Sequence, residues 1–311
     1  MEEFGTRPFA DDDAVAVADL LNAAEVAHGG EPGFTAGEIR GFAGMLLGDS
    51  GGDSRLYLAA DGTLAALAFV GAPPPGGAKA DLIGSVSPDF EGRGLGRALL
   101  TWQLDRVAAL RATIDPGAEW HAEVGIGSEN TAGIRLIERV GGTAVRYGFQ
   151  MEASAADVAA VPIPDGFLFV PYSEAIGPAL HAAHSEAFGD HWGFQVRPFD
   201  NWAPGAIHSD VFRGDLSRIA YDGDDIAAYV LAYDGVAGSV YIGQVGTRRP
   251  WRKRGLASAL LSASVRAAAA TGKTQASLGV DADSPTGAVG VYERLGFETR
   301  HKVVVYHWTV A

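Results

Sequence analysis

The segment Arg252-Lys253-Arg254-Gly255-Leu256-Ala257 has the residue types of an anion-binding turn. It follows the apolar run 240–245 and precedes a run whose apolar residues recur at close to helical spacing. A helix start presents unpaired backbone N–H groups and the positive end of the peptide dipoles, and Gly255 lets a phosphate approach the backbone. The residues therefore predict a phosphate site at a strand-to-helix turn.

A possible proton donor, Tyr292, lies further along the chain on a predicted short helix. A β-type run ends at Asp283-Ser284, which would suit a helix N-cap, and Pro285 would suit the first helical position. The following short helix carries Tyr292, whose phenol can give a proton to a reacting group. The alternative is that Tyr292 only packs this helix against a sheet.

Together these two stretches resemble the coenzyme A site of the GNAT (GCN5-related N-acetyltransferase) family. The resemblance implies acetyl-CoA as co-substrate, with the Val245 N–H on the thioester carbonyl and the two strands beside it splayed to admit pantetheine. It also implies that Tyr292 protonates the departing thiolate, since a thiol pKa near ~8.5 and a phenol pKa near ~10 allow transfer within a hydrogen bond. The implied cofactor-binding residues are Val245, Thr247, Arg252, Lys253, Arg254, Gly255, Leu256, Ala257 and Ser284.

The same pattern occurs twice, because residues 86–100 match the loop region with an offset of 161. The chain therefore resembles tandem members of the family, in an arrangement like that of mycothiol synthase. We expect an N-terminal domain over residues 1–155 and a catalytic domain over 163–311, with a junction around 152–165. A second, weaker CoA site would comprise Val86, Arg93, Gly94, Leu95, Gly96 and Asn130.

The two copies differ in charge and in the proton donor. Ile137 stands where the second copy has Tyr292, and Glu91 stands where it has Arg252. Residues 248–254 hold five cations, whereas residues 1–160 as a whole hold 11 basic and 23 acidic side chains. Because CoA is an anion, charge favours the C-terminal loop. We predict one working site there, with the first domain degenerate and either structural or limited to CoA binding.

The acceptor side lacks the base that the family usually provides. Residues 241–247 contain no acid, so a base must come from elsewhere. The cluster 186–194 mixes acids, a histidine and aromatics, and it suggests Glu186 or His191 as the base. We further expect Asp190, Trp192 and Gln244 to bind the acceptor. The alternative is that Asp190 caps a helix, His191 lies at the surface and Trp192 belongs to the core.

Each half reads as alternating helices and strands, which predicts the α/β class. We expect two tandem GNAT folds, each a central mixed, mostly antiparallel sheet flanked by helices. A β-rich tail is expected to close each half, residues 143–151 in the first and 299–310 in the second.

Composition excludes several classes of protein. With no cysteine, the chain has no disulfide, no thiol nucleophile and no thiolate metal site, and its eight histidines lack ligand spacing, so we expect no metal. A net charge of −14 argues against nucleic acid, and no run of apolar residues is long enough to span a membrane. The acidic start does not resemble a signal peptide, so we expect a cytoplasmic protein.

The resulting hypothesis is an acetyl-CoA-dependent N-acetyltransferase that acts directly on a small-molecule amine in a ternary complex. The alternative is a non-enzymatic protein that binds CoA or sequesters a ligand, suggested by the missing acid and the altered first copy. Tyr292 separates the two, because a sensor has no use for a proton donor. The sequence does not choose between a monomer and a homodimer.

Overall fold

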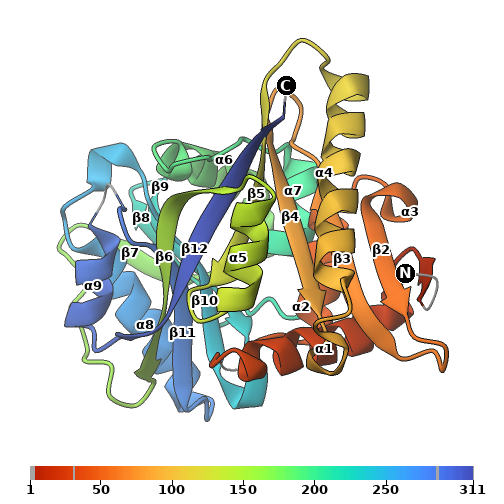
Figure 1. The fold of residues 1–311 in the computed structure, drawn as a ribbon. Coiled ribbons are helices and arrows are strands. Elements are labelled where there is room, and N and C mark those ends of the chain that lie inside the picture. Colours follow the sequence, from red (N-terminus) through yellow and green to blue (C-terminus); the bar gives the residue numbers. More distant parts are fainter. Residues whose placement is uncertain (1–3, 31, 285–286, 311) are drawn as a thin grey trace. The chain divides into compact units, whose positions relative to one another are not determined.

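The computed structural model describes residues 4–30, 32–284 and 287–310. The chain divides into two compact units, Met1–Tyr147 with Val303–Ala311 and Gly148–Lys302. Each unit is a mixed sheet with helices (Figure 1), so the expected α/β class is confirmed. In the part of the chain that is described, no helix is both long and apolar enough to cross a membrane.

The first unit packs helices on both faces of the strand order β1-β2-β3-β4-β5-β12. On β3, Leu67 and Phe69 face α1 and α2, whereas Ala66, Ala68 and Val70 face α4. This alternation is what a strand buried on both sides requires. The elements are β1 (Gly5–Arg7), α1 (Ala14–Ala27), α2 (Ala36–Leu46), α3 (Ser50–Asp53), β2 (Ser54–Leu58), β3 (Leu64–Gly71), β4 (Lys79–Val86), α4 (Leu95–Ile114), β5 (Trp120–Gly127) and α5 (Thr131–Arg139).

The second unit repeats this plan with the strand order β6-β11-β10-β9-β8-β7. On β9, Tyr229, Leu231 and Tyr233 face α6 and α7, and the small residues between them face α8. The elements are β6 (Thr143–Ser154), β7 (Leu168–Pro171), α6 (Gly177–Phe188), α7 (Phe199–Ala206), β8 (Arg218–Asp222), β9 (Asp225–Asp234), β10 (Val240–Thr247), α8 (Leu256–Ala270), β11 (Gln275–Asp281) and α9 (Ala288–Arg294). β12 (Glu298–Val310) follows, and its residues 303–310 belong to the first unit.

Each β-rich tail was expected to close its own half, and this prediction was wrong. Residues 148–154 of β6 pair with β11 of the second unit, and residues 303–310 of β12 pair with β5 of the first. Within the first unit, Trp308 Nε1 donates to the Val140 carbonyl at 3.0 Å and the Tyr306 hydroxyl donates to Glu138 at 3.2 Å. Each half therefore ends by completing the sheet of the other, and the units do not coincide with residues 1–155 and 163–311.

The parallel pair in each sheet is short and opens at one end. In the second unit, β10 and β11 are paired only from Val240 with Ala276 to Ile242 with Leu278. Beyond that point, β10 continues along β9 and β11 continues along β6. We call this opening the fork. The first unit has the same arrangement, since β4 and β5 are paired only from Lys79 to Asp81.

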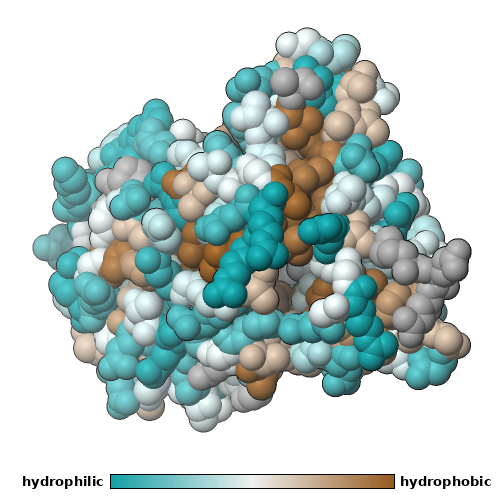
Figure 2. Space-filling model, viewed as in Figure 1, coloured by the Kyte–Doolittle hydropathy of each residue, from teal (hydrophilic) through white to brown (hydrophobic). Residues whose placement is uncertain are grey.

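Hydrophilic residues cover much of the molecular face drawn in Figure 2, and apolar residues show between them in smaller areas. This distribution is ordinary for a folded chain, because there is never enough polar surface to cover the core completely. The fork and the turn that precedes α8 are the features of the second unit that could form a functional site.

Candidate active site

The turn before α8 has the backbone of an anion-binding nest. Gly255 is the N-cap of α8 with φ 81° and ψ 1°, in the left-handed region. Two positions earlier, Lys253 has φ 60° and is the only residue other than glycine with positive φ in the described chain. Alternation through left-handed positions turns successive N–H groups toward one point, where the start of α8 adds its own. The predicted phosphate site thus has suitable geometry.

The first unit builds the same turn. Gly94 is the N-cap of α4 with φ 82° and ψ 0°, which matches Gly255 within a degree. The residue before the turn also matches, with φ −62° and ψ 158° at Glu91 against φ −63° and ψ 157° at Arg252. The backbone of the turn therefore does not distinguish the two units.

A β-bulge in β10 does distinguish them. The register between β10 and β9 shifts between Ile242 and Gln244, at the mouth of the fork. In the first unit, β4 pairs with β3 without any shift from Asp81 to Val86. A bulge leaves one residue outside the ladder and re-aims the backbone that follows it. Only the second unit therefore frees backbone groups of the central strand at its fork.

The bulge also decides what the sheet presents toward α6 and α7. Gln244 stands opposite Leu231 and Gly246 opposite Tyr229, and residues opposite one another share a face. A Cβ on Gly246 would lie 2.4 Å from the Tyr229 ring, and a Cβ on Gly243 would lie 2.5 Å from the Tyr233 ring. Both positions thus require glycine. The Gln244 Oε1 is buried and has no hydrogen-bond partner among the described residues.

Tyr292 lies on α9 with its ring in the core of the second unit, 7% exposed. Burial, with a smaller contribution from the nearby Tyr241, raises the pKa of Tyr292 to about 12. The phenol is therefore protonated at neutral pH. Tyr292 can therefore still donate a proton, as the family resemblance implies. The raised pKa nevertheless makes it a weaker acid than an ordinary phenol.

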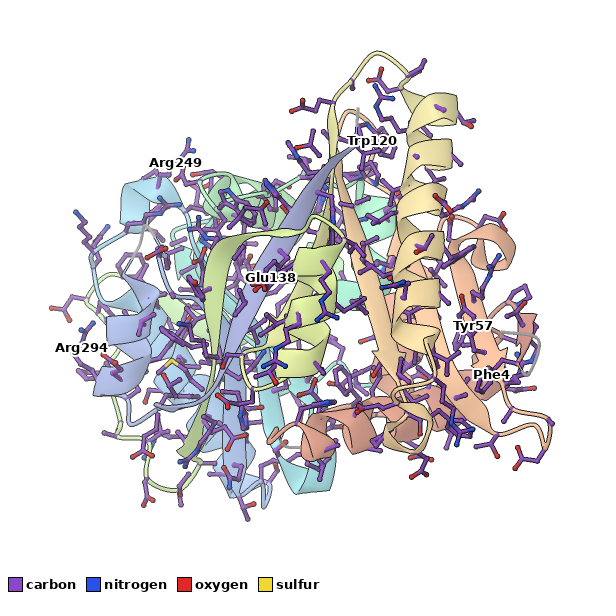
Figure 3. The ribbon with its side chains drawn as sticks, viewed as in Figure 1. Phe4, Tyr57, Trp120, Glu138, Arg249 and Arg294 are labelled. Carbon is purple, nitrogen blue, oxygen red and sulfur yellow. The ribbon has the colours of Figure 1, made fainter. Side chains whose placement is uncertain are left out.

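Most of the cations in the turn are engaged by α6 and the segment after it. Arg252 donates to Asp190 Oδ2 at 2.7 Å, to the Ala187 carbonyl at 2.9 Å and to the Thr247 carbonyl at 3.1 Å. Arg249, which projects from the turn before α8 in Figure 3, forms the second ion pair with Asp190. These partners hold the pKa of Asp190 well below its usual range.

Arg248 in turn pairs with Glu186, Nε to Oε2 at 2.6 Å, and also reaches the Ile226 carbonyl at 3.1 Å. We call the ion pairs of Asp190 and Glu186 with these arginines the latch. The sequence placed Arg252 on a phosphate and Asp190 on the acceptor, and the structure instead places the two against each other. Glu186, a candidate base, has its carboxylate committed to an arginine.

Of the remaining predicted cofactor-binding residues, some could contact a ligand only through the backbone and others through the side chain. Leu256 is 1% exposed and packs in the core, so only its backbone can face a ligand. The exposed Lys253 and the Arg254 guanidinium, which lies over the Phe167 ring at 4.5 Å, are the cations of the turn outside the latch. Val245 and Thr247 line β10 beyond the bulge, and Ala257 lies in the first turn of α8.

The start of α9 differs from the prediction. Its N-cap is Gly287, with φ 68°, and not the Asp283-Ser284 pair. The Asp283 N–H instead donates to Asp281 Oδ1 at 2.9 Å in the turn after β11. Pro285 lies outside the described residues. Ser284 remains next to this turn.

The acceptor-side cluster is partly as expected. His191 packs its ring on Phe188, with centroids 4.4 Å apart, and Trp192 is 43% exposed, so Trp192 is not a core residue. Sequence reasoning missed His184 of α6, whose Nδ1 lies 2.7 Å from the Tyr229 hydroxyl. Glycines at 243 and 246 inside a strand were the available signal that the rings of Tyr229 and Tyr233 approach β10 closely.

In the first unit the corresponding residues have structural roles. Asn130 caps α5, accepting from the Gly133 N–H at 2.8 Å. A Cβ on Gly96 would lie 3.1 Å from Leu136, so Gly96 allows α4 and α5 to pack. Leu95 and Ile137 are core residues, Arg93 lies over Phe90 at 5.1 Å, and Val86 ends β4.

A charged cluster lies at the fork of the first unit. Lys79 Nζ reaches Asp81 at 2.8 Å and Glu123 at 3.6 Å, and burial raises the pKa of Glu123. Because of the bulge, the positions of the second unit that match Asp81 and Glu123 are Tyr241 and Ser277, and neither is charged at neutral pH. An uncharged fork suits the alkyl chain of a pantetheine better than a buried ion cluster does.

Comparisons with known proteins agree with this arrangement. Residues 178–297 match the acetyltransferase (GNAT) family model. A GCN5-related N-acetyltransferase from Sphaerobacter thermophilus is 29% identical with TM-score 0.79, covering 100% of this chain and 96% of that one. A tandem GNAT protein from the clavulanic acid biosynthesis pathway has TM-score 0.70 at 14% identity, covering 99% of both chains. A search of curated proteins finds no significant match.

Proposed function

We propose that this chain, whose second unit is a GNAT domain over residues 178–297, transfers the acetyl group of acetyl-CoA to the nitrogen of a small amine. The observation that carries the proposal is the bulged fork of β10 and β11, which only the second unit combines with a buried tyrosine. In the first unit the fork is unbulged and charged, and Ile137 stands in place of Tyr292. We therefore assign the reaction to the second unit and a structural role to the first.

Each part of the co-substrate has a matching feature in the second unit. The backbone N–H groups of residues 253–257 are proposed to hold the pyrophosphate, with Lys253 and Arg254 as nearby cations. The pantetheine would lie in the fork, and the Val245 N–H would bind the thioester carbonyl, where negative charge develops during attack. The glycine of the bulge, Gly243, is exposed at the mouth of the fork, where the chain would pass.

The chemistry is a direct displacement. The amine nitrogen forms a C–N bond to the carbonyl carbon, the C–S bond breaks, and its electron pair stays on sulfur. The nitrogen loses one proton and the sulfur gains one, so the sum is an amide and a thiol. Tyr292 would supply the sulfur's proton. Its pKa of about 12 suits this role best if the thiolate is also desolvated, because burial raises the pKa of a thiol as well.

The test is acetyl-CoA-dependent thiol release with a panel of primary amines and the full-length protein. We expect release that requires both substrates and forms one acetylated amine for each thiol. Tight acetyl-CoA binding without turnover on any amine would instead support a CoA-binding sensor. Failure to bind acetyl-CoA at all would contradict the proposal.

The latch gives a second prediction. The residue at this position of the turn is basic in the second unit, Arg252, and acidic in the first, Glu91. In the first unit, Glu91 pairs with His28 at the end of α1, Oε1 to Nε2 at 3.3 Å, just as Arg252 pairs with Asp190 after α6. Arg252→Glu should place two carboxylates side by side, loosen the turn from α6 and weaken acetyl-CoA by about threefold to tenfold. It should also lower the Tm.

Adding Asp190→Arg to Arg252→Glu restores an ion pair of the opposite polarity. We expect the double variant to recover part of the lost affinity and Tm, measured by calorimetry and thermal unfolding. Recovery is not complete, because Arg249 also pairs with Asp190 and loses this partner. If the double variant binds as weakly as Arg252→Glu alone while its Tm recovers, Arg252 contacts the ligand directly and the latch is not its function.

A further inference from the structure

The side of the fork toward α6 and α7 carries no acid on its central strand. The β10 residues that face this side are Tyr241, Gly243, Gln244 and Gly246, as their partners on β9 and the tyrosine rings beside the two glycines show. Gln244 contributes a carboxamide, which can accept a hydrogen bond from an N–H group but cannot take a proton at neutral pH. Its Oε1 is buried without a partner among the described residues, so it is available to such a donor.

The carboxylates of α6, of the segment 189–198 and of β11 are all engaged. Helix α6, the segment 189–198 and β11 each carry a single carboxylate, Glu186, Asp190 and Asp281 respectively. Glu186 is paired with Arg248, Asp190 with Arg249 and Arg252, and Asp281 with the Asp283 N–H. Asp200 on α7 and Glu293 on α9 are exposed to solvent. An incoming ammonium group would meet no free carboxylate on these three elements.

The histidines of α6 do not replace the missing acid. His184 is 8% exposed, and burial together with the neighbouring His181 and His191 lowers its pKa to about 4. It is therefore neutral at pH 7, and its conjugate acid is too strong for the imidazole to deprotonate an alkylammonium efficiently. His181 is held by the Arg197 carbonyl at 2.8 Å.

Aromatic side chains dominate the same region. The His184 ring packs against Phe188 at 4.6 Å, Trp202 at 5.4 Å and Phe194 at 5.6 Å between centroids. In the segment 189–198, Trp192 is 43% exposed and Val196 is 59% exposed. Asp190 pairs with two arginines of the turn before α8, and Trp192 lies two residues after it, so this end of the segment is held next to that turn.

From these observations we propose that the acceptor is a weakly basic aromatic amine, an arylamine that reaches the fork as the neutral –NH₂ form. The inference rests on the proposed acetyl transfer. A neutral arylamine needs no base before attack, and its ring suits an aromatic wall. One of its N–H groups would donate to Gln244 Oε1. After the C–N bond forms, the nitrogen becomes far more acidic, and it loses its proton to solvent while sulfur is protonated as described above.

Two isomers with the same atoms test the proposal, 4-methylaniline and benzylamine. At pH 7 the first is neutral and the second is almost entirely protonated. With the full-length protein and saturating acetyl-CoA, we expect kcat/KM for 4-methylaniline to exceed that for benzylamine by about tenfold or more at pH 7. For benzylamine it should rise about tenfold per pH unit up to pH 9, whereas for 4-methylaniline it should stay flat.

A designed base should change this profile. Gln244→Glu places a carboxylate on the acceptor side, and we expect kcat/KM for benzylamine at pH 7 to rise and that for 4-methylaniline to fall. Gln275→Glu is the matched control, because Gln275 is exposed at the far end of β11. It should leave both substrates unchanged. Acetyl-CoA affinity, measured by calorimetry, should be unaffected in both variants.

Two outcomes would overturn the arylamine proposal while leaving acetyl transfer intact. One is a benzylamine kcat/KM that is already independent of pH between 7 and 9, which would require a base that titrates below pH 7. The other is turnover of alkylamines with none of arylamines. Absence of acetyl-CoA binding would overturn the proposed function itself, and calorimetry on the wild-type protein recognises that case separately.

Discussion

Replacing Tyr292 with phenylalanine is expected to lower kcat by about 100-fold or more, with acetyl-CoA affinity and Tm close to the wild-type values. The ring packs in the core of the second unit, and its centroid lies 6.2 Å from that of Phe297. Phenylalanine keeps this packing and removes only the hydroxyl. Because the pKa of Tyr292 is raised to about 12, the hydroxyl is protonated at every pH at which the protein would be assayed.

Steady-state kinetics, calorimetry and thermal unfolding of three variants separate the possible roles. Tyr221→Phe on β8 removes a hydroxyl from the same unit away from α9 and should change nothing. Ile137→Tyr in the first unit should add no activity, since β4 has no bulge there. If Tyr292→Phe turns over at the wild-type rate, the residue only packs α9 and water protonates the thiolate.

The second large effect is expected from Gly255→Ala, which should weaken acetyl-CoA by at least about tenfold. An alanine at φ 81° costs about 1–2 kcal/mol, because its Cβ is crowded in the left-handed region. It also places a methyl group where the proposed pyrophosphate meets the backbone. Nearby protein atoms leave space for this Cβ, the nearest being Pro164 at 3.9 Å, so the fold should survive.

Gly94→Ala is the matched control in the first unit. Gly94 has φ 82°, so the strain should be the same and the two variants should lose similar stability in chemical denaturation. Only Gly255→Ala should change the calorimetric affinity for acetyl-CoA. If Gly94→Ala weakens binding and Gly255→Ala does not, the first unit holds the principal site and our assignment is wrong.

Differences in the strands and in the short helices, and not the charge of the turn, support assigning the reaction to the second unit. From the sequence, the assignment rests on the charge at positions 91 and 252 and on the exchange of Ile137 for Tyr292. In the structure, however, Glu91 contacts His28 and Arg252 pairs with Asp190. The turns themselves have matching backbones. The remaining differences are the bulge, the charged cluster at Lys79 and the exchange of isoleucine for tyrosine. These lie in the strands and in α5 or α9.

The sequence by itself determined the α/β class, the repeat and the two glycine turns. These follow from short-range signals, namely hydrophobic periodicity, a recurring motif at an offset of 161 and the preference of Gly94 and Gly255 for left-handed backbone. It also marked Tyr292, because a tyrosine on a short helix after such a turn is a pattern visible in one stretch of chain. Its catalytic role stays a prediction.

Only the tertiary structure decided which strand each tail joins, where β10 bulges and what each charge contacts. A strand pattern determines which residues face each side of a sheet, but not which neighbouring strand they pair with. The pattern of residues 303–310 is therefore compatible with pairing in the sheet of either half. The bulge depends on Tyr229 and Tyr233 filling the space beside Gly246 and Gly243. Arg252 and Asp190 are 62 residues apart, and their ion pair exists because α6 and the turn before α8 meet in space.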